Sequence, residues 1–447
     1  MKKMYLTWSI LLPLFLFTLA IHAQWSEPGA GTSPLNADNT IYAVHVTSAG
    51  MVLAGGAFRN DSSHTYVAAW SNGTWKELGG DNSLQGDNTI YTIASDTAGN
   101  MYAAGMMTEG GQYVIGHFNA GSGWSLLGNV GFNGYIRSLV TDASGNLYAA
   151  GSFKNDSNQY YVAKWDGSSF SELGTGVNAL KPNGEIKCLT TDQAGNVYAA
   201  GFFTSGGKYY VAKWNGSSWE EAGTLNADNY INDIVTDANG HLFAAGGFTA
   251  PNNISYIAKW NGSTWNAPGN LSTNNYIFDL AADASGNVYA AGSFTNNSNK
   301  PYVAKWDGNT WNEVGAPTGL NPNDDILSVA IAPSGNVYGA GYFTNAGNYN
   351  YVAEFTPTVS NISQANSDFK VSVYPNPFAN QLTLQALQLP ATDMQVYDVA
   401  GRKIYEGKTT SCNYTLITTD WNLGVYWLKI SSPDNSSSQT IRLIKSN

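Results

Sequence analysis

One polar position recurs along the chain and has side chains suited to binding a ligand. An aspartate or asparagine stands three residues before each of seven spaced isoleucines. These residues are Asp38, Asp87, Asn133, Asn183, Asp228, Asn274 and Asn323. Their oxygens suit a cation, a glycan hydroxyl or a basic peptide, but Asn and Asp also favour turns for local reasons. The sequence leaves both interpretations open.

A second acidic position lies in a recurrent turn and offers little to a metal ion. The pattern Asp-x-x-Gly-Asn begins at Asp96, Asp142, Asp192 and Asp283, and a related Asp-Ala-Asn-Gly-His begins at Asp237. Calcium takes about six to eight oxygen ligands, whereas each turn supplies one carboxylate. We therefore expect no cofactor, and calcium is the only cation that these acidic positions suggest.

No catalytic motif emerges from the sequence. It lacks His-Glu-x-x-His, Gly-x-Ser-x-Gly, a phosphate-binding loop and Gly-x-Gly-x-x-Gly after a strand. The acids that break the repeat pattern are Glu185, Asp324, Asp325 and Glu109. An enzyme acting on glycans needs paired carboxylates or a Tyr or His base, and these acids are expected to lie apart. Binding is the preferred function, and a glycan-acting hydrolase or lyase is the alternative.

The elements that would position these residues repeat along the chain. The seven isoleucines are Ile41, Ile90, Ile136, Ile186, Ile231, Ile277 and Ile326. Their spacing runs from 45 residues between Ile186 and Ile231 to 50 residues between Ile136 and Ile186. A period of this length is typical of propeller blades or other stacked repeats.

Each repeat contains four short β-prone runs, which in the third repeat are residues 135–142, 146–153, 160–165 and 169–174. An Asp-Ala-Ser-Gly-Asn turn separates the first two, and an Asp-Gly hairpin signal separates the last two. Four antiparallel strands in a meander form one propeller blade. The aromatic residues of each copy of Tyr-Val-Ala-Lys-Trp are therefore expected to pack between blades rather than to bind sugars.

Ring closure is predicted from the two ends of the repeat region. The seventh repeat stops at residues 351–355, before its fourth strand. Residues 25–29, Trp-Ser-Glu-Pro-Gly, match the fourth strand of the sixth repeat, Trp-Asn-Glu-Val-Gly at 311–315. We predict an all-β fold in which residues 24–355 form a seven-bladed β-propeller closed by an N-terminal strand, because closure removes an exposed sheet edge. The repeats resemble the extracellular propeller family that includes kelch-like and delta-60-type repeats, a resemblance that implies fold rather than activity.

The composition changes after a polar linker at residues 356–368. Residues 369–447 contain alternating β runs, which predict a small β-sandwich. They closely resemble the type A sorting domain of the type IX secretion system. The matching sorting-signal residues are Tyr374, Pro375, Asn376, Pro377, Asp398, Gly401, Arg402, Gly424, Tyr426 and Lys445. The resemblance implies the type IX secretion machinery as a partner, removal of the domain, and release or attachment at the cell surface; an ordinary Ig-like binding module is the alternative.

The N-terminus and the charge agree with export. Lys2 and Lys3 precede an apolar run at residues 10–21, so residues 1–23 are expected to be a signal peptide, too short to span a bilayer. We expect a secreted or cell-surface protein of a Gram-negative bacterium, delivered through the periplasm, with no transmembrane segment. The net charge of −11 and the lack of a basic run argue against nucleic acid as a partner and leave a glycan or protein. Two cysteines, Cys188 and Cys412, cannot form a disulfide framework.

Overall fold

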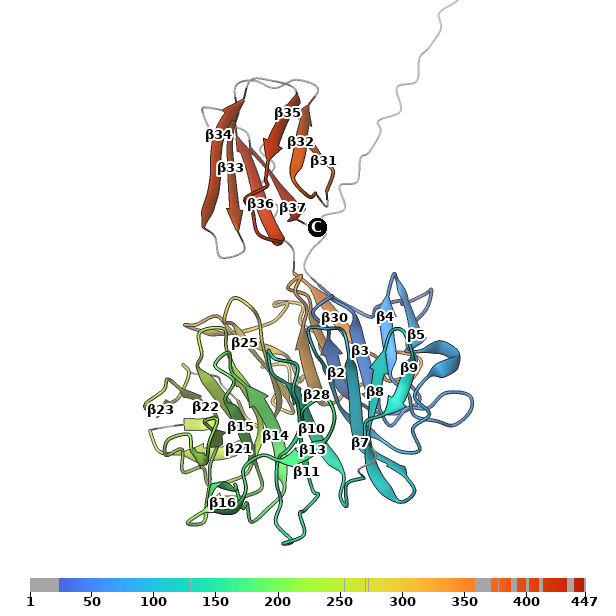
Figure 1. The fold of residues 1–447 in the computed structure, drawn as a ribbon, viewed down its shortest axis with the longest axis vertical. Coiled ribbons are helices and arrows are strands. Elements are labelled where there is room, and N and C mark those ends of the chain that lie inside the picture. Colours follow the sequence, from blue (N-terminus) through green and yellow to red (C-terminus); the bar gives the residue numbers. More distant parts are fainter. Residues whose placement is uncertain are drawn as a thin grey trace, which may run out of the picture. The chain divides into compact units, whose positions relative to one another are not determined.

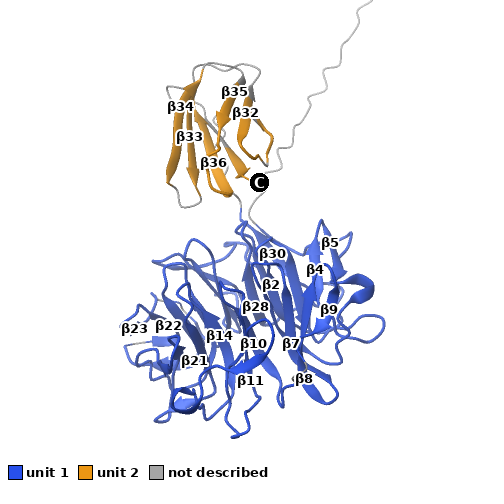
Figure 2. Cartoon of the chain, viewed as in Figure 1, with its two compact units in different colours: residues 1–357 blue, residues 358–447 orange. Residues whose placement is uncertain are grey.

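The computed structural model describes residues 24–357 apart from 129–130, 253, 270 and 272, and residues 371–445 apart from 377, 387–391, 399–401, 410–412 and 432–437. The chain divides into two compact units, residues 1–357 and residues 358–447 (Figure 2). The predicted signal peptide, most of the predicted linker, Pro377, Gly401 and Cys412 lie outside the described residues.

Unit 1 is built from seven four-stranded antiparallel sheets among its described residues (Figure 1). The first three sheets are β2 (Ile41–Val46), β3 (Val52–Gly56), β4 (Ala68–Ser71) and β5 (Thr74–Glu77); β6 (Ile90–Ser95), β7 (Met101–Glu109), β8 (Gln112–Asn119) and β9 (Gly123–Leu126); and β10 (Ile136–Thr141), β11 (Leu147–Gly151), β12 (Ala163–Trp165) and β13 (Phe170–Glu172). Each sheet is a meander, as the four runs of each repeat predicted.

The remaining sheets follow the same order. They are β14 (Ile186–Thr191), β15 (Val197–Gly201), β18 (Ala212–Trp214) and β19 (Trp219–Glu221); β20 (Ile231–Thr236), β21 (Leu242–Ala250), β22 (Ile254–Trp260) and β23 (Trp265–Asn266); β24 (Ile277–Ala282), β25 (Val288–Gly292), β26 (Ala304–Trp306) and β27 (Trp311–Glu313); and β28 (Ile326–Ile331), β29 (Val337–Gly341), β30 (Ala353–Thr356) and β1 (Gln24–Ser26). A small hairpin, β16 (Thr204–Ser205) with β17 (Lys208–Tyr209), and the 3-10 turns η1 (Gly80–Asn82) and η2 (Gly176–Asn178) lie between them.

The seven sheets form a closed, propeller-like ring. The first strand of each sheet contacts the first strands of both neighbours, and β2 contacts β28 across the chain ends. The isoleucine that opens each first strand is fully buried in all seven sheets. Each hydrophobic cluster joins two adjacent sheets, as when Ala104 of β7 packs with Ile136 of β10. The core is therefore a series of layers between sheets, and an open ring would expose two of its faces to water.

Strand β1 supplies the fourth strand of the seventh sheet. Trp25 lies opposite Phe355 in the antiparallel pair of β1 with β30. The Glu27 carboxylate accepts hydrogen bonds of 3.2 Å from the Asn345 side chain, and the Trp75 indole of the first sheet donates to the Pro28 carbonyl at 3.2 Å. The N-terminal strand therefore bonds to the sheets on both sides of the join.

The tryptophans of the fourth strands bond as well as pack. The indole N–H of each donates to a backbone carbonyl at the end of the preceding sheet's fourth strand. These pairs are Trp25 with Val314, Trp75 with Pro28, Trp124 with Leu78, Trp219 with Leu173, Trp265 with Ala222 and Trp311 with Pro268, at 2.6 to 3.2 Å. Phe170 holds this place in the third sheet and has no N–H to donate. The packing role expected for the aromatic residues thus comes with a repeated bond between sheets.

Unit 2 contains two antiparallel sheets among its described residues. One is β31 (Val371–Tyr374), β32 (Gln381–Ala386) and β35 (Asn413–Ile417); the other is β34 (Lys403–Thr409), β33 (Thr392–Asp398), β36 (Gly424–Ser431) and β37 (Ser438–Lys445). Leu384 of the first sheet shares a buried cluster with Met394, Leu428 and Leu443 of the second. The alternating pattern of the sequence therefore places one face of each sheet in a common core.

Closure by β1 predicts how substitutions at Trp25 affect stability. Trp25→Ala removes a large ring and a hydrogen bond between sheets, and should lower the free energy of unfolding of unit 1 by about 3 kcal/mol. Trp25→Phe keeps the ring and loses the bond, and should cost about 1 kcal/mol. Calorimetric unfolding measures both, with Trp427→Ala in unit 2 as the control. If Trp25→Ala left the unfolding transition of unit 1 unchanged, the result would contradict closure by this strand.

Candidate functional site

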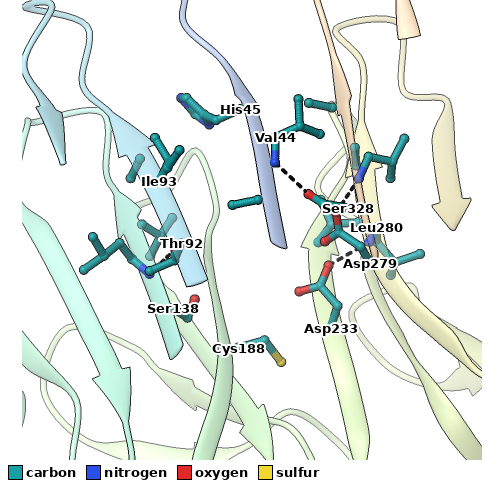
Figure 3. Close-up of a pocket in the computed structure, with 18 of the residues that line it drawn as sticks. Val44, His45, Thr92, Ile93, Ser138, Cys188, Asp233, Asp279, Leu280 and Ser328 are labelled. Atoms are coloured by element: carbon teal, nitrogen blue, oxygen red, sulfur yellow. Dashed lines mark hydrogen bonds between the residues drawn. The ribbon is translucent and has the colours of Figure 1, made fainter. Parts of the chain in front are cut away.

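The inner strands enclose a cavity of about 710 Å³. Its wall is made by the four or five residues that follow the buried isoleucine in each of the seven first strands, with Tyr342 added from the seventh sheet. Figure 3 shows part of this wall, with side chains from neighbouring strands directed into the space. The repeat therefore brings the same stretch of every unit to one cavity.

The second residue after the isoleucine ties neighbouring sheets together. We call the junction between two neighbouring sheets a seam. In five of the seven seams between described strands, the side-chain oxygen of this residue accepts the backbone N–H of the next sheet's first strand, at 2.6 to 3.1 Å. The acceptors and donors are Thr92 and Leu139, Ser138 and Leu189, Asp233 and Leu280, Asp279 and Val329, and Ser328 and Val44. Ala43 has no side-chain acceptor, and the Cys188 thiol lies 3.6 Å from its own sheet's Ala200 carbonyl. Sequence reasoning missed these bonds, because small polar residues in a strand carry no motif.

Two of these acceptors are carboxyl groups that lie side by side. Asp233 and Asp279 project from adjacent strands and face each other beside Ser328 (Figure 3). Burial, together with the neighbouring Asp279 carboxylate, holds the pKa of Asp233 well above its usual value, and burial also raises the pKa of Asp279. Two such groups in contact cannot both be charged without a large penalty, so the pair retains a proton at pH values where isolated carboxyls are ionised.

One end of the cavity is surrounded by positions that differ from repeat to repeat. These are the residue before each isoleucine, the residue after it, and the residue that follows the second-strand glycine paired with that isoleucine. We call these 21 positions the rim: Thr40, Tyr42, Ala57, Thr89, Tyr91, Met106, Tyr135, Arg137, Ser152, Glu185, Lys187, Phe202, Tyr230, Asn232, Gly247, Tyr276, Phe278, Ser293, Asp325, Leu327 and Tyr342. Backbone bonds hold the strand ends together there, as when the Phe202 N–H donates to the Glu185 carbonyl at 2.9 Å.

On one side of the rim an arginine is enclosed by aromatic rings and an acid. The Arg137 guanidinium lies 4.7 Å from the Tyr91 ring centroid and 4.6 Å from that of Tyr135. Its Nε donates to Glu185 Oε1 at 2.8 Å, and the Tyr135 hydroxyl donates to Glu185 Oε2 at 3.0 Å. Both oxygens of Glu185 are thus engaged, and its charge is compensated by Arg137.

On the adjoining side a lysine lies among aromatic rings without an acidic partner. Lys187 Nζ donates to Asn232 Oδ1 at 2.5 Å and lies 5.8 Å from the Phe202 centroid and 5.9 Å from that of Tyr230. Within the described residues no carboxylate oxygen forms an ion pair with it. Burial lowers the pKa of Lys187, as expected where a cation is partly removed from water.

Aromatic rings beside Lys187 form a platform. Phe202 lies 5.0 Å from Tyr230, and Tyr230 stacks on Tyr276 with centroids 6.2 Å apart and planes 10° apart. A Cβ at Gly247 would overlap the Tyr276 ring, so glycine makes room for it. Phe202 is 37% exposed and Tyr276 36%. The rings are held in place while part of their surface stays open to solvent.

The seven Asp and Asn residues predicted to bind a ligand form hydrogen bonds that link two loops of the same sheet. All seven side chains are exposed, and in each the Oδ1 atom or the amide bonds to a residue 21 positions later. The partners are Arg59, Thr108, Lys154, Thr204, Thr249, Thr295 and Thr344 in the same order. None of the seven lines the cavity. These clamps join each entering loop to the loop after the second strand, and ligand binding by them stays a prediction.

The recurrent turn acids are also occupied. Asp142 accepts the backbone N–H groups of Ser144 and Asn146 through Oδ1, and the Asn146 amide and Tyr148 hydroxyl through Oδ2. In the seventh sheet Glu354 accepts the equivalent amide and hydroxyl bonds. Across the part of the chain that the structure describes, no group of three or more His, Cys, Asp or Glu side chains is placed to hold a metal ion.

Within the described residues no hydrogen bond or ion pair joins Glu185 or Glu109 to the Asp324–Asp325 pair. Glu185 faces Arg137, whereas Asp324 Oδ1 accepts the backbone N–H of Asp325 at 2.8 Å. Burial and the neighbouring Asp324 raise the pKa of Asp325. Glu109 is exposed at the end of β7. Arg137, Lys187 and the aromatic platform were not singled out from the sequence, although the change of residue type at one fixed repeat position was a usable signal.

Several sorting-signal residues of unit 2, among them Asn376, Tyr426 and Lys445, lie on or against strand β37. Asn376 accepts the Ile444 N–H and donates to the Arg442 carbonyl, both at 2.8 Å, and Lys445 Nζ donates to the Ala379 carbonyl. Tyr426 of β36 pairs with Asp398 on one side and Leu443 on the other. Asp398 also binds Arg402 through its side chain at 2.7 Å. Tyr374 ends β31, Pro375 follows it, and Gly424 begins β36.

Comparison with protein families identifies this second unit. Residues 372–445 match the family model of the secretion system C-terminal sorting domain. Unit 2 is a sorting domain of this family. It implies handling by the type IX secretion machinery and export to the cell surface or medium. No helix of the described part of the chain has the length and apolarity needed to cross a membrane.

Solved structures resemble the chain in fold. PorZ, a bacterial surface component of the type IX secretion system of Porphyromonas gingivalis, is 16% identical with a TM-score of 0.50 over 93% of this chain and 60% of that chain. A fungal alcohol oxidase of the AA5 family, solved with copper, is 14% identical with a TM-score of 0.52 over 94% of this chain and 99% of that one. The chain thus spans less than two thirds of PorZ, and these identities show an all-β, propeller-like fold alone. No curated protein matches the chain.

The clamp interpretation predicts a difference between two substitutions at Asp228. Asp228 accepts the N–H and the hydroxyl of Thr249, both at 2.6 Å, and the hydroxyl bond lowers the pKa of the carboxyl. Asp228→Asn should be nearly neutral at pH 7, since Asn274 makes the same clamp, whereas Asp228→Ala should cost about 1 kcal/mol. Urea unfolding measures both.

The pH dependence gives a second readout of the same clamp. A depressed pKa in the folded state stabilises above the unfolded value, about 4, and this contribution is lost as the pH falls through the folded pKa. Asp228→Asn should therefore lose less stability than the wild type on acidification. If Asn proved as harmful as Ala at pH 7, the clamp would not be the role of this side chain.

The carboxyl pair predicts the opposite pH dependence. A raised pKa in the folded state stabilises below the unfolded value, and the contribution is lost as the pH rises through the folded pKa. Asp233→Asn keeps an oxygen for the Leu280 N–H and removes one titrating group. The variant should therefore gain stability over the wild type as the pH rises from about 4 to 8. A thermal midpoint difference that stays constant with pH would contradict a shared proton.

Proposed function

We propose that this protein is an exported, non-catalytic β-propeller binding protein that reaches the cell surface or medium by type IX secretion. Residues 1–23 are the signal peptide, residues 24–355 the seven-bladed propeller of kelch-like type, residues 356–368 the linker, and residues 369–447 the β-sandwich sorting domain. The ligand is a glycan or a protein. The matched sorting domain and the closed ring of sheets support this assignment.

The observation that carries the binding role is the contrast between neighbouring positions of the repeat. The isoleucine and the third residue after it stay apolar in all seven first strands, because they pack between sheets. The residue directly after the isoleucine, by contrast, changes from sheet to sheet: it is Tyr42, Tyr91, Arg137, Lys187, Asn232, Phe278 or Leu327. All seven line the cavity. Side chains freed from the demands of packing and gathered at one opening are typical of a ligand site.

The same geometry argues against glycan hydrolysis or elimination at the rim. A general acid or base must exchange a proton within hydrogen-bond reach of the substrate. Glu185 is held by Arg137 and Tyr135, and His45 lies deeper, where burial lowers its pKa to about 4. Among the described residues neither Glu185 nor His45 forms a hydrogen bond with Asp325. Binding without turnover is therefore the function that the site supports best.

A glycan and cell-surface polysaccharide array tests this function. The mature chain, residues 24–447, is applied with and without calcium, and the same samples are assayed for released reducing ends. We expect binding with no turnover, and binding that is lost in a Tyr276→Ala variant whose unfolding midpoint is unchanged. Release of reducing ends by the wild type would establish the enzymatic alternative. Failure to bind any carbohydrate would leave a protein ligand, to be sought by cross-linking at the rim.

A further inference from the structure

We propose that the rim binds an acidic sugar of an extracellular polysaccharide, with the sugar ring against the Tyr276–Tyr230–Phe202 platform and the sugar carboxylate on Lys187. The inference rests on the proposed binding function and names its ligand class. It is carried by two features of the rim that lie next to each other: a fixed, partly exposed aromatic surface and a cation without an acidic partner.

The aromatic platform suits the flat, C–H-bearing face of a pyranose. The Tyr230 and Tyr276 rings are nearly parallel, and Gly247 leaves space for the outer ring, so the platform is formed before a ligand arrives. Pre-formed surfaces bind without the entropic cost of ordering side chains. The Tyr230 and Tyr276 side chains also carry hydroxyls, which can bond to those of a sugar. Leu327 is the aliphatic residue among the rim positions that line the cavity, which gives an apolar peptide side chain little to bury against.

Lys187 supplies the preference for negative charge. The Lys187 ammonium has three N–H donors and gives one of them to the neutral Asn232, so donor capacity remains. A partly buried cation without a counter-ion is costly, and a ligand carboxylate would relieve that cost. Two acids, Asp233 and Glu185, act on Lys187 through space without forming an ion pair with it: Glu185 is paired with Arg137, and Asp233 lies beside Asp279 deeper in the wall.

The arrangement also selects among anions. The charge of Arg137 is balanced by Glu185, so Lys187 is the rim cation that has no acidic partner in an ion pair. A polyphosphate or a sulfated chain of high charge density favours several cations, which the rim does not offer. A sugar that carries a single carboxylate on each ring matches one cation beside one platform.

Calorimetric titration with defined oligosaccharides tests the proposal. The mature chain is titrated with oligogalacturonate and with a neutral cello-oligosaccharide of equal length, at low and at moderate salt. We expect the oligogalacturonate to bind at least tenfold more tightly than the neutral sugar. Lys187→Met should remove this preference, and Tyr276→Ala should weaken both sugars. Lys305→Met is the matched control. Lys305 of β26 also lies over an aromatic ring, that of Tyr289 on β25, but it does not line the cavity.

Each outcome separates this inference from the proposed function. Equal affinity for the two sugars, unchanged by Lys187→Met, would overturn the acidic-sugar assignment and leave a glycan-binding protein. Loss of binding in Lys305→Met as well as in Lys187→Met would also overturn it, since the effect would not belong to the rim. No binding of either sugar, with a protein captured by rim cross-linking, would overturn the sugar assignment while sustaining a binding function. A wild-type protein that binds nothing in any of these assays would defeat both.

Discussion

The structure of unit 1 depends on the seams between neighbouring sheets. A four-stranded sheet of this size has two faces to cover, and in a ring each face is covered by the next copy. The buried isoleucines fill the seams near the axis, side-chain oxygens cross them along the inner strands, and tryptophan N–H groups cross them at the outer strands. The ring cannot end on an uncovered face, so β1 must return to complete the last sheet.

This constraint explains why the sequence was informative about architecture. Every seam has the same geometry, so the isoleucine, the turn acid and the fourth-strand pattern recur along the chain. The observed sheets agree with this spacing, and the β1–β30 pair confirms that residues 25–29 supply the missing fourth strand. Hydrogen bonds between residues far apart in the sequence could not be predicted from it. Asp87 and Asn133 look alike as turn residues or ligands until their partners 21 residues later are seen. The same holds for Ser138, whose acceptor role is visible only beside Leu189 of the next sheet.

The positions of each repeat fall into two groups. Positions that must fit a seam are nearly the same in every unit, and positions that face the open end of the cavity differ. Arg137 and Lys187 occupy equivalent places in adjacent sheets, yet Arg137 is paired with Glu185, whereas Lys187 donates to the neutral Asn232. Departures from the repeat thus mark positions whose residue type is not fixed by packing between sheets. In unit 2, by contrast, the recognised motif residues hold the last strand in place, as Asn376 does for β37.

The most direct test of this account is a parallel scan of stability and carbohydrate binding. Single alanine substitutions at the non-glycine, non-alanine rim positions are compared with substitutions at the seven buried isoleucines, using the unfolding midpoint and polyuronate affinity of each variant. The account predicts that rim variants clustered around Lys187 lose affinity at near wild-type stability, and that isoleucine variants lose stability by about 2 to 5 kcal/mol. Rim variants that lose stability as the isoleucine variants do, with affinity tracking stability alone, would contradict it.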